Sequence, residues 1–532
     1  MKIYQLINKN LFYLFLLFYF FIAVSASLKT GITHDERFDL HNYQLNKNII
    51  SNFFLNTDLN TEYLYGEKAF MTAFYGIGFH LLSFPIEQIL NFLDLDFDLT
   101  NEGRLQILKH PSIIILFIIS GIYFKKLIYL TTSNKNFSSI ASVFYLMYPY
   151  LIGHSFFNTK DSPFMSVWLI CTFFIATIVK DFLFKEKIYL KKIVILGCLT
   201  SILISIRIVG FLIFLEYLIF LIILLSNTNI EIKSFLKKTF KPIVIFLLTV
   251  IISVYILHPH FWKNPETLFF ALDFFKNHIQ TVCTITLGTC MKAQDLPSSY
   301  LPIWFFFKLP IIVMLGLLLF PFTDKKIFKK KINLLVIGSL ISTILLILTL
   351  LIITKAIIYD ELRHVLFLIP LILIISFTAL SNFFSKKILY SSFLIYIFFF
   401  SFQNIKIFPY NYLWLNNISS FLKVSGNFEL DYWGASTRNV ANFFKNKHID
   451  PKKCIISNRN DGLQYYLKNN FHNCYIPFKN LEKKNQRPFY VALMERKLTK
   501  GLPVRCKEIH SEKINLNFSR ENIVLAKVFE CN

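Results

Sequence analysis

The sequence predicts a polytopic α-helical membrane protein with a small domain outside the membrane. Hydrophobic residues make up 55% of its 532 residues and charged residues only 17%, whereas a typical soluble domain has about 25% charged residues. The apolar residues also gather in runs long enough to cross a bilayer, which takes about 20 residues of helix. This composition excludes a soluble enzyme, a disordered chain and a fibrous repeat.

Eleven apolar runs are expected to be membrane-spanning helices. The long block from 192 to 226 is divided at Arg207, because a guanidinium is costly at the centre of a bilayer. The first run is expected to stay as a helix, with cleavage of a signal peptide near residues 23–26 as the alternative. The runs are residues 11–28, 112–131, 138–156, 163–180, 192–207, 209–226, 241–258, 304–322, 334–354, 364–383 and 387–405.

Lysine clusters mark alternate connections between these runs, and the positive-inside rule places those connections in the cytoplasm. The clusters lie at 125–126, 185–192, 233–241, 325–331 and 386–387. An odd number of spans then puts the long connections 29–110 and 259–303, and the C-terminal tail, outside. These lysines and the basic tail account for the net charge of +24 without a nucleic-acid partner. Because the abundance of Phe, Ile, Lys and Asn is typical of an AT-rich genome, we expect a bacterial inner membrane, with the outer segments facing the periplasm or exterior.

The two long outer connections are expected to contain helices that lie along the membrane surface. Residues 66–93 repeat apolar residues at helical spacing, with Pro85 as a break. Residues 266–279 repeat the pattern less clearly. Cysteine usage agrees with the topology, because six of the eight cysteines fall in outer segments, which suits an oxidising compartment. Cys283 and Cys290 form a plausible local pair, the pairings in the tail stay open, and a zinc site is the alternative.

The tail predicts a small α/β domain of its own. Short apolar strands are expected at 454–457, 489–494 and 523–529, with a helical patch at 461–468. The chain thus divides into a membrane domain, residues 1–405, and an extracytoplasmic domain, residues 406–532.

Ionisable residues gather where the outer segments meet the membrane. One cluster follows the first span and contains His34, Asp35 and Glu36. Reduced dielectric there raises the pKa of a carboxylate and makes it a better general base. The alternative is an ordinary helix start, with Thr33 or Asp35 as the N-cap.

A second cluster lies in the turn between the third and fourth spans. In the segment HSFFNTKDSP, His154, Lys160 and Asp161 precede the next apolar run. Helix capping explains Asp161, with Pro163 close behind it. Capping explains His154 and Lys160 less well, so the segment is a second candidate for catalysis.

Arginines at the outer ends of spans form a third group. Arg104, Arg207 and Arg363 would give a lipid phosphate fixed positive partners, and snorkelling to the interface is the alternative. The two histidines around Pro259 suit an interfacial turn better than a metal, and the D-x-D-x-D string at 94–98 suits a solvated loop. No cofactor is therefore expected, with a divalent metal ion as the alternative.

These motifs, in this order and on one side of the membrane, resemble the membrane glycosyltransferases of the GT-C fold, of the protein mannosyltransferase and aminoarabinose transferase type. That family has an acidic motif opening the first outer loop, matched by Asp35-Glu36. It has an Arg before the second span, matched by Arg104. It has an acid before a Pro at the outer start of the fourth span, matched by Asp161, and often an Arg at the outer start of a late span, matched by Arg363. The segments HSFFNTKDSPF and FELDYWG are also similar to some bacterial relatives.

The resemblance implies inverting transfer of a sugar from a polyprenyl phosphate, such as undecaprenyl or dolichyl phosphate, to an acceptor. By match, Asp35 is the base on the acceptor, Glu36 supports it, and Asp161 positions the acceptor or the base. The residues expected to hold the donor phosphate are Arg363, Arg104, Arg207 and Lys68. Those expected to position the acceptor are His34, His154 and Lys160. The acceptor stays open among a protein, a glycolipid and a polysaccharide.

Three other functions are considered beside this one. A membrane transporter or a flippase for lipid-linked glycans usually has polar sites near the midplane and internal repeats, and this sequence shows neither pattern clearly. A ligase or oligosaccharyltransferase that uses a lipid pyrophosphate is favoured by a divalent metal near Asp35. A scaffold without catalysis is supported if glycan products persist when Asp35 is replaced.

Overall fold

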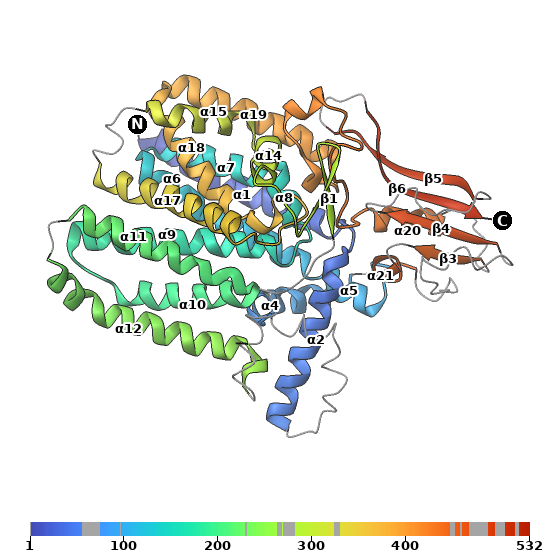
Figure 1. The fold of residues 1–532 in the computed structure, drawn as a ribbon, viewed down its shortest axis with the longest axis horizontal. Helices are drawn as coiled ribbons and strands as arrows, with labels where there is room; N and C mark the ends of the chain where they lie inside the picture. The colour runs from blue at the N-terminus through green and yellow to red at the C-terminus, as the bar shows by residue number, and fades with distance from the viewer. Residues whose placement is uncertain are drawn as a thin grey trace.

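The computed structural model is mainly α-helical, with a four-stranded sheet near the C-terminus. Figure 1 shows the long helices side by side, with the sheet beyond one end of the bundle and the N-terminus near the other end. Lys68, the first part of the expected helix at 66–93 and, apart from residue 269, the expected helix at 266–279 lie outside the described residues. The structure describes residues 2–55, 75–95, 97–228, 231–262, 269, 282–323, 330–446, 453–457, 460–467, 488–494, 506–516 and 521–531.

Each of the eleven apolar runs is helical. The corresponding helices are α1 (Lys2–Ser27), α6 (His110–Thr132), α7 (Lys135–Met147) with α8 (Pro149–Ser155), α9 (Asp161–Lys185), α10 (Leu190–Ile206), α11 (Ile213–Ser226), α12 (Ile232–Leu257), α14 (Tyr300–Lys308) with α15 (Ile311–Leu319), α17 (Lys331–Ile353), α18 (Leu368–Phe383) and α19 (Lys386–Ile407).

Not every run has full spanning length. Within the described residues, seven helices are long and apolar enough to cross a membrane, and the number is eight if the pair α14 and α15, bent by 115°, counts as one span. Proline divides two of the runs, because the residue before a proline is driven out of the helical region. Tyr148 and Leu309 accordingly have extended backbone before Pro149 and Pro310. The remaining helices, α10 and α18, have 17 and 16 residues.

One acid is buried inside the helical bundle. Glu216 of α11 accepts hydrogen bonds from Trp168 Nε1 and Thr172 Oγ1 of α9, each at 2.6 Å. A carboxylate within a membrane span is costly unless its oxygens are bonded in this way. The contact therefore joins α9 to α11, whose outer ends adjoin Asp161 and Arg207.

Three helices follow α1 on the outer side: α2 (His34–Leu55), α4 (Gly78–Phe92) and α5 (Asn101–Ile107). Pro85 lies inside α4 and does not break it, because α4 is supported on α6 and α10. In α4 the polar Ser83 and Glu87 are buried, whereas apolar side chains such as that of Ile89 are exposed. This inverted pattern suits a helix whose outer face contacts lipid.

The tail forms α20 (Thr437–Asn446), β3 (Cys454–Ser457), α21 (Asn460–Leu463), β4 (Phe489–Met494), β5 (Cys506–Ile514) and β6 (Ile523–Cys531). The strand order is β3-β4-β6-β5, with β3 and β4 parallel and the other pairs antiparallel. The sheet and α20 bury one apolar face together with Ile32 and Ile107 from the outer segments. The tail therefore packs directly on the segment that precedes α2.

Two disulfides have both of their cysteines among the described residues, and both lie in the segments expected to be outside. The predicted pair Cys283–Cys290 closes a hairpin of β1 (Cys283–Thr286) and β2 (Thr289–Lys292). Cys506 and Cys531 join the neighbouring strands β5 and β6. The hairpin also bonds to the tail, because Glu429 N–H donates to Ile285 O at 2.9 Å.

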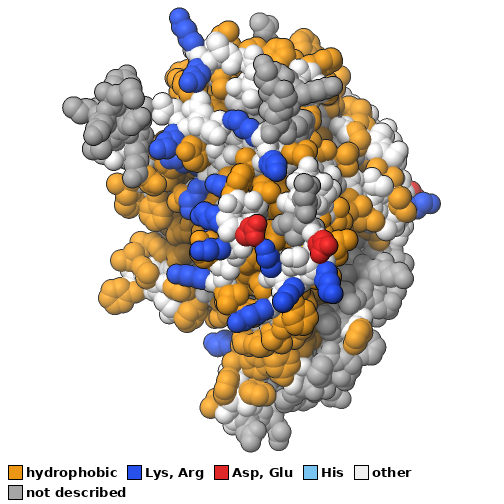
Figure 2. Space-filling view, turned by 90° about the vertical axis from the view of Figure 1, so that its left-hand side faces the viewer, with side chains coloured by type: hydrophobic (Ala, Val, Ile, Leu, Met, Phe, Trp, Pro, Cys, Tyr) orange, Lys and Arg blue, Asp and Glu red, His pale blue; other side chains and the backbone are white. Residues whose placement is uncertain are grey.

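Positive charge gathers at the end of the bundle opposite the sheet. Figure 2 views that end and shows many Lys and Arg side chains among hydrophobic ones, with few acids. Exposed lysines there include Lys187, Lys233 and Lys387 in the connections expected to be cytoplasmic. The sheet and the outer helices lie at the other end (Figure 1).

We predict that cysteines introduced at opposite ends of the bundle react from opposite sides of the membrane. In spheroplasts, a membrane-impermeant maleimide should label Lys423→Cys, in the tail. It should label Lys187→Cys only after permeabilisation. The unsubstituted protein is the control, since its free cysteines, Cys171 and Cys198, lie in α9 and α10. Labelling of both positions before permeabilisation would contradict the topology.

Candidate active site

Residues from five distant parts of the chain border one small hollow where the helical bundle meets the tail, with about 260 Å³ of empty space that includes space open to solvent. They come from the start of α2, the turn between α8 and α9, the break between α10 and α11, the turn before α18, and the tail. The lining residues are Thr33, Asp35, Glu36, Phe157, Asn158, Thr159, Lys160, Asp161, Arg207, Arg363 and Trp433. The hollow thus brings two of the predicted acidic motifs together with two of the predicted arginines.

The start of α2 is fixed by the Glu36 side chain, which reaches back to Thr33. Glu36 Oε1 accepts hydrogen bonds from the backbone N–H and the hydroxyl of Thr33, at 2.7 and 2.8 Å, so two groups at the helix start are satisfied. Glu36 Oε2 lies 2.8 Å from His110 Nε2, and both side chains are buried. Glu36 is therefore committed to holding this turn, which presents the adjacent Asp35 to the hollow.

Asp35 lies opposite a guanidinium. Its Oδ2 is 3.4 Å from Arg363 Nη2, and 29% of its side chain is exposed. Burial raises the pKa of Asp35, but the positive charges of Arg363 and Lys160 outweigh burial and hold its pKa below the usual value. The expectation of a raised pKa was wrong, because the sequence reveals the reduced dielectric but not the cations that surround the carboxylate.

Asp161 is held by an amide and a guanidinium. Asn158 Nδ2 donates to Asp161 Oδ2 at 3.0 Å, and Asn158 Oδ1 accepts the N–H of Asp161 at 2.8 Å. Arg207 donates to the other carboxylate oxygen of Asp161. The side chain at the start of α9 that accepts a backbone N–H is therefore Asn158, not the expected Asp161. The Asp161 carboxylate instead fixes Arg207 beside the hollow.

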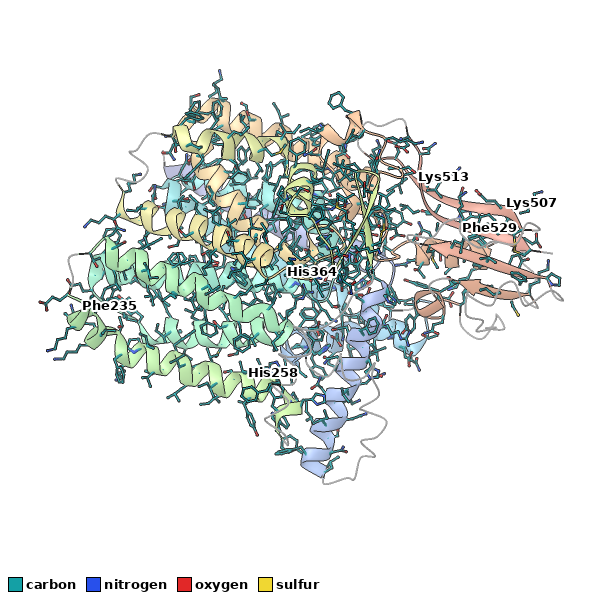
Figure 3. All side chains as sticks on the ribbon, viewed as in Figure 1. Phe235, His258, His364, Lys507, Lys513 and Phe529 are labelled. Atoms are coloured by element: carbon teal, nitrogen blue, oxygen red, sulfur yellow. A yellow bond between two sulfur atoms is a disulfide. The ribbon has the colours of Figure 1, made fainter. Side chains whose placement is uncertain are left out.

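Arg363 is enclosed by aromatic rings and acids. Its guanidinium carbon lies 4.8 Å from the ring centre of Tyr359 and 4.5 Å from that of Trp433. Arg363 Nη1 donates to Asp360 Oδ2 at 3.3 Å, and Nη2 donates towards Asp35 Oδ2 and Tyr359 Oη, each at 3.4 Å. Figure 3 labels the neighbouring His364, which lies where the bundle meets the outer segments and far from Phe235 at the lysine-rich end.

The turn before Arg363 has an unusual backbone. Asp360 and Glu361 have φ values of +57° and +65°, a region that costs a non-glycine residue about 1–3 kcal/mol. The turn is held from outside, since Asp360 N–H donates to Thr284 Oγ1 and Glu361 N–H donates to Tyr300 Oη, each at 2.9 Å. These bonds explain how two strained residues persist beside the hollow.

The Glu361 side chain adds a buried anchor to the same turn. Its Oε2 lies 2.7 Å from Lys308 Nζ, with side-chain exposures of 1% and 0%. Lys308 belongs to α14, so the ion pair ties the turn to a helix of the bundle.

A second buried network lies one turn further along α2. Lys109 Nζ is 3.1 Å from Asp39 Oδ2 and 3.0 Å from His80 Nδ1. Burial and the charge of Lys109 lower the pKa of His80 to about 3, so its neutral ring accepts from Lys109 and donates from Nε2 to Asn42 Oδ1 at 3.0 Å. Burial raises the pKa of Asp39, but Lys109 and His80 bring its pKa below the usual value. The network keeps α2 in place behind Asp35.

The other predicted site residues lie around the hollow or away from it. Lys160 lines it, and its Nζ lies 4.4 Å from the ring centre of Tyr75. His154 does not line the hollow itself, but its Nδ1 lies 3.2 Å from Nδ2 of Asn158, which does. His34 does not line the hollow, and its ring packs edge-on against Phe38.

Arg104 is not among the residues that border the hollow. It forms an ion pair at 3.0 Å with Asp94, whose side chain is 88% exposed. Arg104 thus lies apart from Arg363 and Arg207, and its assignment to a phosphate site stays a prediction. Asp98 pairs instead with Lys445 of α20 at 2.7 Å.

In the part of the chain that the structure describes, no group of three or more His, Cys, Asp or Glu side chains is arranged to hold a metal ion.

Comparison with known proteins adds a likeness of fold. No family model matches the chain, and no curated protein matches it. Among solved structures, it is similar to ArnT from Cupriavidus metallidurans bound to undecaprenyl phosphate, with 12% identity, 98% of this chain and 97% of that chain covered, and a TM-score of 0.45. It is also similar to ArnT from the same organism in the apo state, with 10% identity, the same coverage and a TM-score of 0.48. These TM-scores are below 0.5, so the functional argument rests on the site.

We predict that breaking the Asp161–Arg207 pair from one side destabilises the protein. Arg207→Ala leaves a buried carboxylate without its cation and should lower the free energy of unfolding by about 3 kcal/mol. The double variant Arg207→Ala/Asp161→Asn removes both charges and should recover much of that loss. Unfolding in detergent measures both variants; a double variant that is less stable than Arg207→Ala would count against the pairing.

Proposed function

We propose that this protein is an inverting glycosyltransferase that moves a sugar from a polyprenyl phosphate to an acceptor at the outer face of the membrane. The observation that carries the proposal is the shared hollow, in which Asp35 lies among Arg363, Arg207 and Lys160. A hollow at the outer end of an apolar helical bundle suits a donor whose tail stays in lipid and whose sugar phosphate reaches the surface. By this proposal the protein resides in a bacterial inner membrane, with the hollow and the tail facing the periplasm.

The proposed reaction needs a base and a fixed positive field. Asp35 takes the proton of the acceptor hydroxyl, and the acceptor oxygen attacks the anomeric carbon from the face opposite the phosphate. The bond from the anomeric carbon to the phosphate oxygen breaks, and the phosphate leaves with the electron pair. Arg363 and Arg207, with Lys160, would stabilise the charge that develops on this leaving group.

The arginines of the hollow already face carboxylates. Arg363 contacts Asp35 and Asp360, and Arg207 contacts Asp161. A donor phosphate must therefore share or replace these partners when it binds. The 3.4 Å contact between Asp35 and Arg363 is longer than a normal charge-assisted hydrogen bond, so it is the contact that a phosphate would displace most easily.

We predict that Asp35→Asn abolishes transfer while leaving the fold intact. The amide keeps the shape of the carboxylate but cannot take a proton, so turnover should fall at least about 100-fold. Radiolabelled sugar transfer in isolated membranes measures the loss. A matched control is Glu508→Gln, which neutralises an exposed acid on β5 and should leave transfer unchanged. Retained turnover in Asp35→Asn would reject Asp35 as the base.

A pH dependence follows from the charges around Asp35. The carboxylate faces Arg363, Lys160, His34 and Arg207, and its lowered pKa keeps it ionised well below neutral pH in the free protein. A bound phosphate offsets the positive charge of Arg363 and so raises the pKa of Asp35. Because the base acts only when ionised, activity is lost as the pH falls through that pKa.

We therefore predict that the acid limb of kcat, which reports the complex, lies at higher pH than the acid limb of kcat/KM, which reports the free protein. Arg363→Ala should move the limb of kcat/KM upward as well. Initial rates between pH 3 and pH 8 in detergent measure both limbs, and coincident limbs in the unsubstituted protein would contradict the exchange of partners at Arg363.

A further inference from the structure

We propose that the tail segment Asp431–Arg438 belongs to the catalytic centre, with Trp433 as a positioning residue for Arg363. This inference rests on the proposed function, because it assigns Arg363 to the donor phosphate. It gives a role in donor binding to the tail, which follows the last helix of the bundle in sequence and is not part of that bundle.

Trp433 is placed to set the plane of the guanidinium. Its ring lies on one side of Arg363 at 4.5 Å, and Tyr359 lies at 4.8 Å. Trp433 also lines the hollow and is 3% exposed. A planar guanidinium packed against aromatic rings can meet a phosphate only through its edge. Trp433 therefore restricts Arg363 to an edge-on presentation.

The same segment holds the turn that carries Asp35. Trp433 O accepts the backbone N–H of His34 at 3.1 Å. Arg438 Nη1 donates to Leu28 O at 2.8 Å. At Gly31 the two backbones come so close that an added Cβ would lie 2.2 Å from Ala435 O. The segment thus contacts both sides of the proposed chemistry, the base and the phosphate-binding cation.

The segment is itself rigidly built. Asp431 has a φ of +38° and its Oδ1 accepts from the backbone N–H of Ala435 at 2.8 Å and from the hydroxyl of Tyr412. Its Oδ2 accepts from the backbone N–H of Ser436 at 3.2 Å. Burial raises the pKa of Asp431, and these donors satisfy both of its oxygens. A turn fixed in this way can hold the Trp433 ring against Arg363.

The test replaces Trp433 in the full-length protein and measures donor and acceptor KM separately. Trp433→Leu keeps apolar volume but removes the aromatic face, and the donor KM should rise about 10- to 30-fold, the factor expected for a desolvated cation–π contact. The acceptor KM should change much less. Trp433→Phe keeps an aromatic face and should bring the donor KM back to within about threefold of the unsubstituted value.

A matched control in the tail is Lys445→Ala, which removes a surface ion pair with Asp98 and should leave both KM values unchanged. Thermal unfolding in detergent shows whether each variant is folded. If Trp433→Leu is not folded, Trp433→Phe and Tyr359→Leu decide the question. Trp433→Phe should give a donor KM near the unsubstituted value. Tyr359→Leu should give a raised donor KM.

The outcomes separate this inference from the proposed function. An unsubstituted protein that transfers no sugar overturns the proposed function and this inference with it. An active protein in which Trp433→Leu leaves the donor KM unchanged overturns only the role of Trp433. The role of Trp433 is also overturned if the donor and acceptor KM rise equally in Trp433→Leu, or if Trp433→Phe is as impaired as Trp433→Leu. A purely structural role of Trp433 predicts both of these results.

Discussion

The site depends on how one buried guanidinium is held. Arg363 carries a full charge into a pocket where its side chain is 7% exposed, and such a charge must be paired to be tolerated. Its partners come from the turn before α18, from the start of α2 and from the tail. Because Asp35 lies 328 residues from Arg363 in sequence, satisfying this one charge fixes how the segments around the hollow meet.

The outer segments are built around this requirement. The hairpin closed by Cys283–Cys290 holds Asp360 through Thr284, and α14 holds Glu361 through Lys308. The tail packs its apolar face on Ile32 and so supports the turn before α2. The helical bundle carries Asp161 and Arg207 at the ends of helices that Glu216 joins. The charged groups therefore converge where the bundle meets the tail, and His364, next to Arg363, lies far from Phe235 at the lysine-rich end (Figure 3).

The sequence predicted those features that depend on one segment at a time. Lipid requires long apolar helices, so all eleven runs were recognised as helical, but in the described residues only seven helices, or eight with the bent pair α14 and α15, are long enough to span. Asp35, Asp161 and Arg363 stood out as charges beside such runs. Features that depend on partners were missed or wrong. Trp433 lies in the segment FELDYWG, which the sequence marked by resemblance without a role, because a contact with Arg363 leaves no trace in a single segment. Strand β5 was missed because CKEIHSEKI is largely polar. The pKa of Asp35 is lowered and not raised, because Arg363 and Lys160 come from other segments.

The central claim is that this hollow binds a polyprenyl phosphate through its cations. An experimental structure of the protein in a lipid nanodisc with undecaprenyl phosphate tests this most directly. The account predicts the phosphate within hydrogen-bond reach of Arg363 and of Arg207 or Lys160, with Asp35 no longer bonded to Arg363. A phosphate held elsewhere, for example beside Lys355 in the second hollow of about 990 Å³, would contradict it.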